Sequence, residues 1–221
     1  MSSPVLQPGA VTRALDAWVL AEAREAHEVE VTLGAQERAL LDDMPWPNRR
    51  AEWLGGRRAA KRVLEAAFGW SHDRVQILPL ESGAPSVWLD GAQRTDIVLN
   101  LSHTKSWVAA TVASGRVGID VCDDKDGPRI ARIAERVLND GEAEACGALA
   151  SPQNGAAVWA LKEAGLKLFI GGVFDPGARV IVVQSLSPAR VKAPVPMRVE
   201  LLRLPDAALA IARDAVESAA P

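Results

Sequence analysis

The sequence has few of the residues that build disulfide frameworks and zinc sites. Its 221 residues include two cysteines, Cys122 and Cys146, and three histidines. The cysteines form no C-x-x-C pair, and two of them cannot make the framework typical of small disulfide-rich domains. A structural zinc site, which needs four closely arranged Cys or His ligands, is therefore not expected.

Long apolar runs and an excess of basic charge are absent as well. No run approaches the roughly 20 apolar residues of a membrane-spanning helix, and MSSPVLQPGAVTRALDAW lacks the pattern of a signal peptide. A net charge of −3, from 25 basic and 28 acidic residues, gives no overall footprint of a nucleic-acid binder. We therefore expect a soluble cytoplasmic protein that binds neither nucleic acid nor membrane. Basic side chains still cluster locally, at Arg49, Arg50, Arg57, Arg58, Lys61 and Arg62.

Several signatures of common enzyme classes are missing. There is no fixed-period repeat, no Walker-type phosphate loop and no G-x-G-x-x-G after a strand. No G-x-S-x-G surrounds a serine, which disfavours a serine hydrolase. The chain is 48% hydrophobic and 24% charged, so it can bury a core, and its length allows one large domain or two small ones.

Predicted strands and helices interleave in both halves of the chain, with a midpoint near residue 115. Strands are expected in AWVLAEA, RVQILPL, DIVLNLS, SWVAATVAS, RVGIDVC, ARVIVVQSL and MRVELLRL, which have β-branched residues or apolar runs. TLGAQERALLDDM is a predicted helix with Thr32 as its possible cap. The apolar spacing predicts long helices after Pro47 and within GAAVWALKEAGLKLFIGG, and one helix followed by the start of another over residues 128–149.

The segment VGIDVC places a carboxylate on an apolar strand. Alternate residues of a strand share a face, so Gly118, Asp120 and Cys122 point one way and the valines and isoleucine the other. Asp120 is either a metal ligand or a strand-end residue that caps the following loop.

The segment WALKEAGLK places charge on an apolar helix. Trp159, Glu163 and Lys167 are four residues apart and therefore stack along one face. They form either a solvated ion pair or, with Lys162 beside them, part of a site.

Two further groups of residues could bind phosphate. Ser102 and His103 follow an apolar strand, where they either satisfy the local backbone or contact a ligand. Arg49 and Arg57 are eight apart, a little over two helical turns, so both can face one partner. Arginine matches the oxygens of a phosphate, although a solvated basic face is the alternative.

Together these segments resemble the 4′-phosphopantetheinyl transferases of the larger, surfactin-synthetase-activating type, in particular the enterobactin-like branch. The matching pieces are RRAEWLGGRRAAKRVL, GAP, NLSHT, VGIDV, ERVLNDGE and WALKEAGLK, in the family's order over roughly residues 36–175. The resemblance implies an α+β, pseudo-twofold duplicated fold, with two similar α/β halves and the active site at their interface. Residues 1–114 would carry the coenzyme A phosphate-binding elements, and residues 115–221 the metal and catalytic elements.

The resemblance also implies a function. Such an enzyme transfers 4′-phosphopantetheine from coenzyme A to a serine of an apo acyl, peptidyl or aryl carrier protein, with Mg²⁺, in secondary metabolite biosynthesis, and an internally duplicated chain is expected to be a monomer. Glu142 matches an acidic residue of the family with an open role. The family's pattern assigns catalysis to Glu163, Lys167 and His103, metal ligation to Asp120 and Glu163, and coenzyme A binding to Arg49, Arg57, Ser102, His103 and Lys167.

The sequence departs from the family's pattern at three positions. Cys122 replaces a second carboxylate, so that water or Asp123 would have to complete the metal site. Ala84 replaces a lysine, and Gly165 replaces an aromatic residue. The alternative function is therefore a degenerate homologue that binds coenzyme A or a carrier protein without efficient transfer. The apolar run LKLFIGGVF is either a surface for a carrier helix or an internal packing segment.

Overall fold

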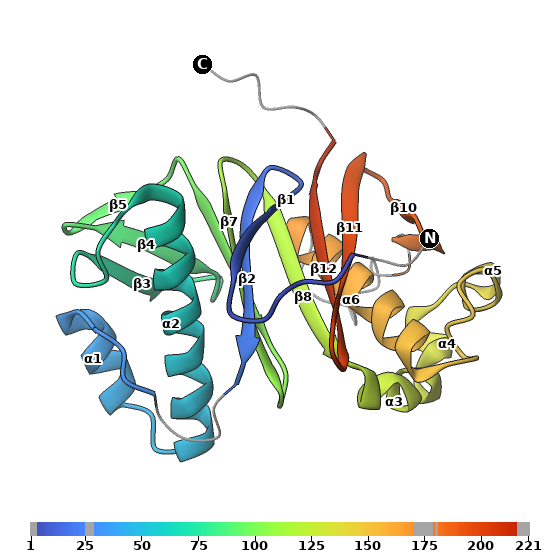
Figure 1. Ribbon diagram of the computed structural model, residues 1–221, viewed down its shortest axis with the longest axis horizontal. Helices are drawn as coiled ribbons and strands as arrows, with labels where there is room; N and C mark the ends of the chain where they lie inside the picture. Colours follow the sequence, from blue (N-terminus) through green and yellow to red (C-terminus); the bar gives the residue numbers. More distant parts are fainter. Residues whose placement is uncertain (1–3, 25–28, 170–178, 180, 216–221) are drawn as a thin grey trace. The chain divides into compact units, whose positions relative to one another are not determined.

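The computed structural model describes residues 4–24, 29–169, 179 and 181–215 (Figure 1). The chain divides into two compact units. Unit 1 comprises Met1–Gln7 and Arg116–Pro221, and unit 2 comprises Pro8–Gly115. Among the described helices, none is long and apolar enough to cross a membrane.

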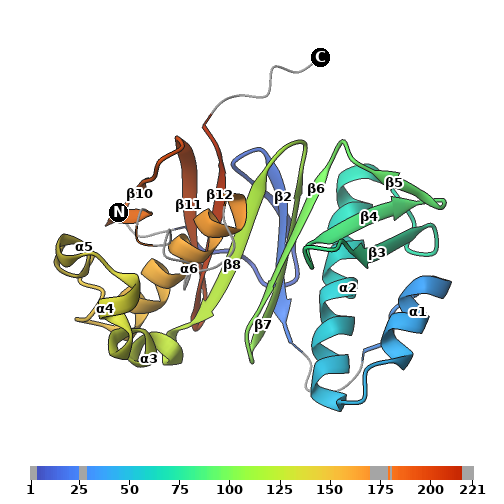
Figure 2. The same cartoon turned by 180° about the vertical axis from the view of Figure 1, so that it is seen from behind.

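Unit 2 is built on an antiparallel sheet with the strand order β1-β2-β7-β6. Helix α2 packs against β2, β6 and β7, and a smaller sheet has the order β3-β4-β5 (Figure 2). The elements are β1 (Val11–Ala14), β2 (Ala17–Ala23), α1 (Ala35–Asp42), α2 (Pro47–Phe68), β3 (Val75–Pro79), β4 (Pro85–Leu89), β5 (Ala92–Arg94), β6 (Val98–His103) and β7 (Trp107–Ala113).

The helices of unit 2 begin and end where their local sequence allows. Pro47 occupies the first position of α2, where its missing N–H costs nothing, and Gly69 ends the helix with φ 70°. The prediction of a long helix here is confirmed. The prediction that Thr32 caps α1 is wrong, because Gly34 is the N-cap and the Glu37 carboxylate accepts the Gly34 N–H at 3.0 Å.

Unit 1 is built on a second antiparallel sheet, with the order β11-β12-β8. Helix α6 packs against all three strands, and β9 pairs with β10 in a separate hairpin. The elements are β8 (Val117–Asp123), η1 (Asp124–Asp126), α3 (Gly127–Arg132), α4 (Ala134–Val137), α5 (Asp140–Ala145), α6 (Pro152–Phe169), β9 (Val182–Leu186), β10 (Ala189–Lys192), β11 (Met197–Leu204) and β12 (Ala207–Asp214). The start of the described chain joins this unit, because the Leu6 N–H donates to the carbonyl of Arg203 at 2.9 Å.

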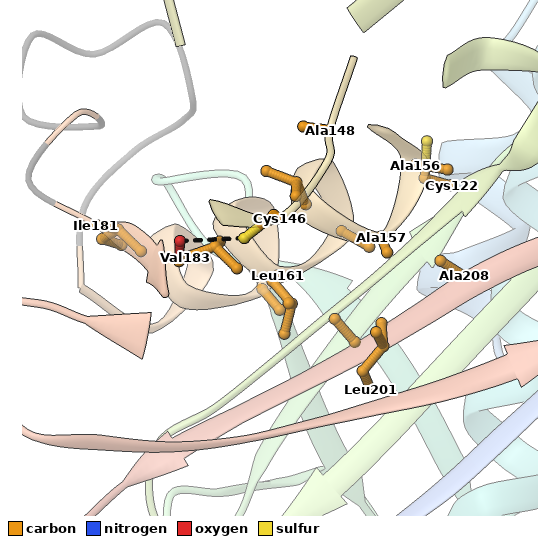
Figure 3. Packing of buried hydrophobic residues seen from close by; sticks show 14 of the residues in the cluster. Cys122, Cys146, Ala148, Ala156, Ala157, Leu161, Ile181, Val183, Leu201 and Ala208 are labelled. Carbon is orange, nitrogen blue, oxygen red and sulfur yellow. Dashed lines mark hydrogen bonds between the residues drawn. The ribbon is translucent and has the colours of Figure 1, made fainter. Parts of the chain in front are cut away.

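Small residues let α6 approach the sheet closely. A Cβ placed on Gly118 would lie 2.0 Å from the carbonyl oxygen of Ala164, which is well inside contact distance. Ala208, Ala210 and Ala212 of β12 are fully buried in the apolar cluster beneath α6. In Figure 3 Cys122 lies beside Ala156 in this cluster. The helix therefore sits on a sheet surface made of glycine, alanine and cysteine.

Both units use the same order of elements. Each has a strand (β2 or β8), a short helix (α1 or α5), a long helix (α2 or α6) and then a hairpin (β3–β4 or β9–β10). Each ends with a second hairpin (β6–β7 or β11–β12), whose last strand pairs antiparallel with β2 or β8 of that unit. The units differ in that unit 2 also has β1 before β2 and β5 after β4, and unit 1 has η1, α3 and α4 between β8 and α5.

Candidate active site

The face of β8 that was predicted to carry polar groups is turned toward α6. Gly118 packs against the backbone of Ala164, and Cys122 belongs to the apolar cluster around α6. Between them, the carboxylate of Asp120 accepts a hydrogen bond from Lys167 of α6. The alternation expected for a strand therefore holds at all three positions.

Asp120 and Lys167 form a partly buried ion pair. The Lys167 Nζ lies 2.8 Å from Oδ1 of Asp120 and donates a second hydrogen bond, of 2.9 Å, to the carbonyl of Ile119. Asp120 is buried, while the Lys167 side chain keeps 24% of its exposure. Within the described residues these bonds use two of the three ammonium donors. Strand β8 and helix α6 thus bring a carboxylate and a cation together at a point that solvent reaches.

Glu163 lies one helical turn from this ion pair. Residues four apart on a helix stack on one face, so Glu163 shares the face of α6 that carries Lys167. It is half-buried. A Cβ on Gly118 would touch α6 near Leu168, whereas one on Gly127 would touch Pro152, so α6 runs opposite to β8. Glu163 is therefore displaced from Lys167 in the direction of Cys122.

The donor set around Asp120 was tested against the Mg²⁺ that the resemblance implies. Among the described residues, no group of three or more His, Cys, Asp or Glu side chains could hold a metal ion. Mg²⁺ commonly takes one or two carboxylates and completes its shell with waters and phosphate oxygens. Asp120 and Glu163 are oxygen donors of the type that such a site uses, and their binding of one ion stays a prediction.

Cys122 does not fit a magnesium site. It is 5% exposed and packs in the apolar cluster, with its Sγ 3.7 Å from the Asp123 carbonyl. Burial, reinforced by the charge of Asp120, raises the pKa of this thiol, so it stays protonated and soft. Asp123 is also buried and pairs with Lys125 at 3.0 Å, on the alternate face of the strand.

Glu142 and Lys162, by contrast, form a buried ion pair that stabilises the fold. Their side chains are fully buried, with Nζ and Oε2 2.9 Å apart. The same carboxylate accepts the N–H groups of Asn139 at 3.0 Å and Val183 at 2.6 Å, and Lys162 also donates to the carbonyl of Ile181. Burial lowers the pKa of Lys162, and the charge of Glu142 opposes that shift. The pair ties α5, α6 and β9 together.

One of the departures from the family's pattern, at Gly165, has a local explanation. A Cβ on Gly165 would lie 3.2 Å from Ile181 and 3.4 Å from the Sδ of Met197, so these side chains fill the space that an aromatic residue would need. Ala84 is exposed beside Gly83, whose φ is 83°, in the turn between β3 and β4. Ile170–Phe174 of the LKLFIGGVF segment lie outside the described residues.

In unit 2, most of the basic side chains of α2 are already engaged. Arg58 and Arg62 both contact the carboxylate of Glu22. Lys61 pairs with Glu37 at 2.9 Å. Arg50, in turn, donates to the carbonyl of Leu41 at 2.7 Å. Glu22 and Glu37 thus offset part of the positive charge of the local basic cluster, and Arg49 and Arg57 are the cations still to explain.

Arg57 is a buried guanidinium that pairs with no carboxylate among the described residues. It is 9% exposed, donates from Nη2 to the Ile77 carbonyl at 3.2 Å, and stacks with its Cζ 3.9 Å from the centre of the Trp53 ring. Its Nε is buried without a hydrogen-bond partner. Burial lowers the pKa of Arg57 to about 10, with Glu37 opposing the shift and Arg49 adding to it.

Arg49 is 63% exposed and lies 3.8 Å from Glu52, which is a loose ion pair. Its charge adds to the lowering of the pKa of Arg57. That both arginines face one partner stays a prediction.

Ser102 and His103 are the last residues of β6. Ser102 is buried and His103 is exposed. The residue after them is held by Arg24, whose Nη1 donates to the Thr104 carbonyl at 2.9 Å and to Glu52 of α2 at 3.0 Å. Arg24 was not identified from the sequence, where a single arginine after a strand carries no signal. Its contacts link the end of β6 to the α2 face that bears Arg49.

Comparisons with known proteins agree with the resemblance at the level of the family. Residues 116–192 match the model of the 4′-phosphopantetheinyl transferase superfamily. A holo-[acyl-carrier-protein] synthase of Geobacillus kaustophilus (strain HTA426) is 34% identical over 98 residues, which cover 40% of this chain and 72% of the relative.

A solved holo-(acyl-carrier-protein) synthase from Bacillus anthracis str. Ames, in complex with CoA (3′,5′-ADP), aligns with 25% identity over 38% of this chain and 75% of that chain, with a TM-score of 0.33. The family model covers β8, α6 and the segments around them, which carry the Asp120–Lys167 pair. The family model and the shared identity over most of the Geobacillus relative show that the chain belongs to the 4′-phosphopantetheinyl transferase superfamily, a family of enzymes.

Proposed function

We propose that the protein transfers the 4′-phosphopantetheine arm of coenzyme A to a serine of an apo carrier protein of the acyl, peptidyl or aryl type. The observation that carries this proposal is the contact between Asp120 and Lys167, with Glu163 one turn away on the same helix face. These residues come from the two motifs that match the family most specifically. They supply two carboxylates and a cation, which are the charged groups that can stabilise a pyrophosphate substrate.

In the proposed reaction the serine hydroxyl attacks the phosphorus that bears pantetheine. The bond from that phosphorus to the bridging oxygen breaks, and adenosine 3′,5′-bisphosphate leaves. Glu163, directly or through a water, accepts the serine proton. Lys167 places its positive charge beside the phosphates, where negative charge develops. Asp120 and Glu163 would hold Mg²⁺, which when bound neutralises charge on the pyrophosphate.

Coenzyme A is proposed to be anchored by residues of unit 2. Arg57 is a buried cation without a carboxylate partner among the described residues, and Arg49 is exposed and only loosely paired, so both are suited to the 3′-phosphate. Ser102 and His103 would assist at the phosphates. Arg24 supports this by fixing the backbone directly after His103. In this proposal residues 1–114 carry the coenzyme A phosphate-binding elements, and residues 115–221 carry the metal and catalytic elements.

We also propose that the two units are duplicated halves, as in the larger type of the family. The order of their elements supports this, and so does a buried Lys–Glu pair that recurs in detail. In unit 2 the Lys61 Nζ lies 2.9 Å from Glu37, and Glu37 accepts the N–H of Ile77 at 2.9 Å. Lys61 donates to the carbonyl of Val75, two residues before Ile77.

The pair in unit 1 has the same arrangement. Lys162 contacts Glu142, Glu142 accepts the N–H of Val183, and Lys162 donates to the carbonyl two residues earlier. Both glutamates stand at the third position of a short helix, in a capping box. Such a repeated set of partners supports a common origin of the halves. That the active site lies at their interface stays a prediction.

The alternative is a degenerate homologue that binds coenzyme A or a carrier without efficient transfer. It is favoured by Cys122, which cannot supply the second carboxylate of β8, and by Ala84, which removes a cation. The ion pair of Asp120 with Lys167 argues against this alternative, because the other charged residues of the two motifs are still present and these two are in contact.

One assay separates the two functions. The protein is mixed with coenzyme A, Mg²⁺ and several apo carrier proteins, and the mass of each carrier is measured. Transfer adds the mass of one phosphopantetheine to at least one carrier and releases adenosine 3′,5′-bisphosphate. Tight binding of coenzyme A with no gain in mass on any carrier would support the degenerate homologue instead.

A further inference from the structure

Arg57 and Arg94 of unit 2 both stack on a tryptophan, and they differ in their partners. A third stack, of Arg13 on Trp18, involves an exposed arginine. Arg94 lies 4.6 Å from the Trp70 ring, but two of its nitrogens already donate to Asp96, at 2.9 and 2.6 Å. Arg57 is closer to its ring, at 3.9 Å from Trp53, and no described carboxylate pairs with it. The two stacks are similar in type, but only the guanidinium of Arg94 is paired with a carboxylate.

The surroundings of Arg57 give it little compensation for burial. A single hydrogen bond, to the Ile77 carbonyl, accompanies a side chain that is 9% exposed, and its Nε is left without a partner. Burying a charge without an ion pair or a full set of hydrogen bonds is unfavourable. An anionic ligand that accepts from the Nη groups of the guanidinium would reduce that cost.

Trp53 restricts the orientation of Arg57. It stands four residues before Arg57 on α2, so the two side chains share a helix face. Stacking uses the flat face of the guanidinium and leaves its in-plane N–H groups for hydrogen bonds. The ring therefore limits the rotation of a long, flexible side chain.

We propose that Trp53 is a positioning residue for the 3′-phosphate of coenzyme A, which holds the Arg57 guanidinium in one orientation, with its Nη groups toward that phosphate. This inference rests on the proposed function, because it takes coenzyme A as the ligand of Arg57. Trp53 acts through Arg57 and touches no reacting atom. Without the ring, Arg57 must lose its rotational freedom when the ligand binds, which weakens binding by roughly two- to tenfold.

The test compares coenzyme A with 3′-dephospho-coenzyme A, which lacks only the phosphate in question. Their dissociation constants are measured by calorimetry for the wild type and for Trp53→Leu, Trp53→Met and Trp53→Phe, after thermal unfolding shows which variants fold. The variants without a ring should bind coenzyme A two- to tenfold more weakly and bind the dephospho compound unchanged. Trp53→Phe should restore most of the preference. Trp70→Leu removes the occupied stack of Arg94 and should leave both constants as in the wild type.

The kinetic counterpart uses the same proteins. In the transfer assay the variants without a ring should raise KM for coenzyme A and leave kcat unchanged, because chemistry occurs at another part of the ligand. Equal weakening of both ligands, or unchanged binding of both by a folded variant without a ring, would overturn the role of Trp53.

Failure of the proposed function is seen separately, in Arg57→Ala. If that variant keeps the wild-type preference for coenzyme A over the dephospho compound, Arg57 does not bind the 3′-phosphate, and the assignment fails before Trp53 is considered. If Arg57→Ala loses the preference and folded Trp53 variants keep it, only the positioning role fails. If the wild type transfers nothing but prefers coenzyme A, the binding measurements still decide the role of Trp53.

Discussion

Replacing Gly118 with alanine tests the close packing on which the site depends. The new Cβ would lie 2.0 Å from the Ala164 carbonyl oxygen and 3.0 Å from its carbon. Both are backbone atoms of α6, so no side chain can rotate away, and the helix or the strand must move by about 1.4 Å to restore contact distance. Overpacking of this kind costs about 1–3 kcal/mol, and the rigidity of the neighbours favours the upper end.

The assay is thermal unfolding with a matched control. A loss of about 3 kcal/mol should lower the Tm by roughly 6–12 °C for a chain of this size. Gly141 of α5 is exposed, and a Cβ there would meet nothing within 4 Å, so Gly141→Ala should be neutral or slightly stabilising. If Gly118→Ala and Gly141→Ala unfold at the same temperature, the close approach of α6 to β8 is refuted. The shift of α6 should also disturb the Asp120–Lys167 contact and reduce transfer by about a hundredfold.

Three further predictions concern the buried pairs, the cysteines and Arg24. Lys162→Met and Lys61→Met each leave a buried carboxylate unpaired, so each should lower the free energy of unfolding by about 3–5 kcal/mol in chemical denaturation; a loss in only one of them would contradict the equivalence of the pairs. Cys122 and Cys146 are buried with raised pKa values, so Ellman's reagent at pH 8 should label them only after unfolding, and labelling of the native protein would contradict their burial. Because the unfolded thiols lose their protons near pH 9.0 while the folded ones keep them, stability should fall as the pH rises above 9, and less so in the double alanine variant. Arg24→Ala frees the Thr104 carbonyl and should raise KM for coenzyme A with little change in kcat, whereas an equal fall in kcat would assign Arg24 a different role.

The parts of the fold that follow local rules could be predicted from the sequence. The long helix after Pro47, the strand VGIDVC and its two faces, and the helix of WALKEAGLK all have the expected positions. β12 gave no strand signal, because AALAIARD is rich in alanine, which has a low strand propensity. Its alanines are used for close packing under α6, which is a tertiary requirement. Residues 128–149 form short helices, α3, α4 and α5, rather than the single helix and helix start expected.

Site residues could be predicted from the sequence only where they belong to a motif. Spacing on one helix or strand placed Glu163 with Lys167, and Asp120 on the same face of β8 as Gly118 and Cys122. It could not show that Lys162 turns inward to Glu142, since that depends on a partner 20 residues away. The contact of Arg24 with Thr104 spans 80 residues, and no local pattern reports it. Long-range side-chain partners are fixed by packing, which the sequence alone does not reveal.

The central claim is that Glu163, with Asp120 and Lys167, carries out phosphopantetheinyl transfer. It is tested most directly by the initial rate of mass gain on an apo carrier for Glu163→Gln, which keeps the size of the side chain and removes its charge. Glu144→Gln, on the exposed face of α5, is the matched control. The account predicts that Glu163→Gln folds like the wild type and transfers nothing measurable, while Glu144→Gln transfers at the wild-type rate. A wild-type rate in Glu163→Gln would contradict it.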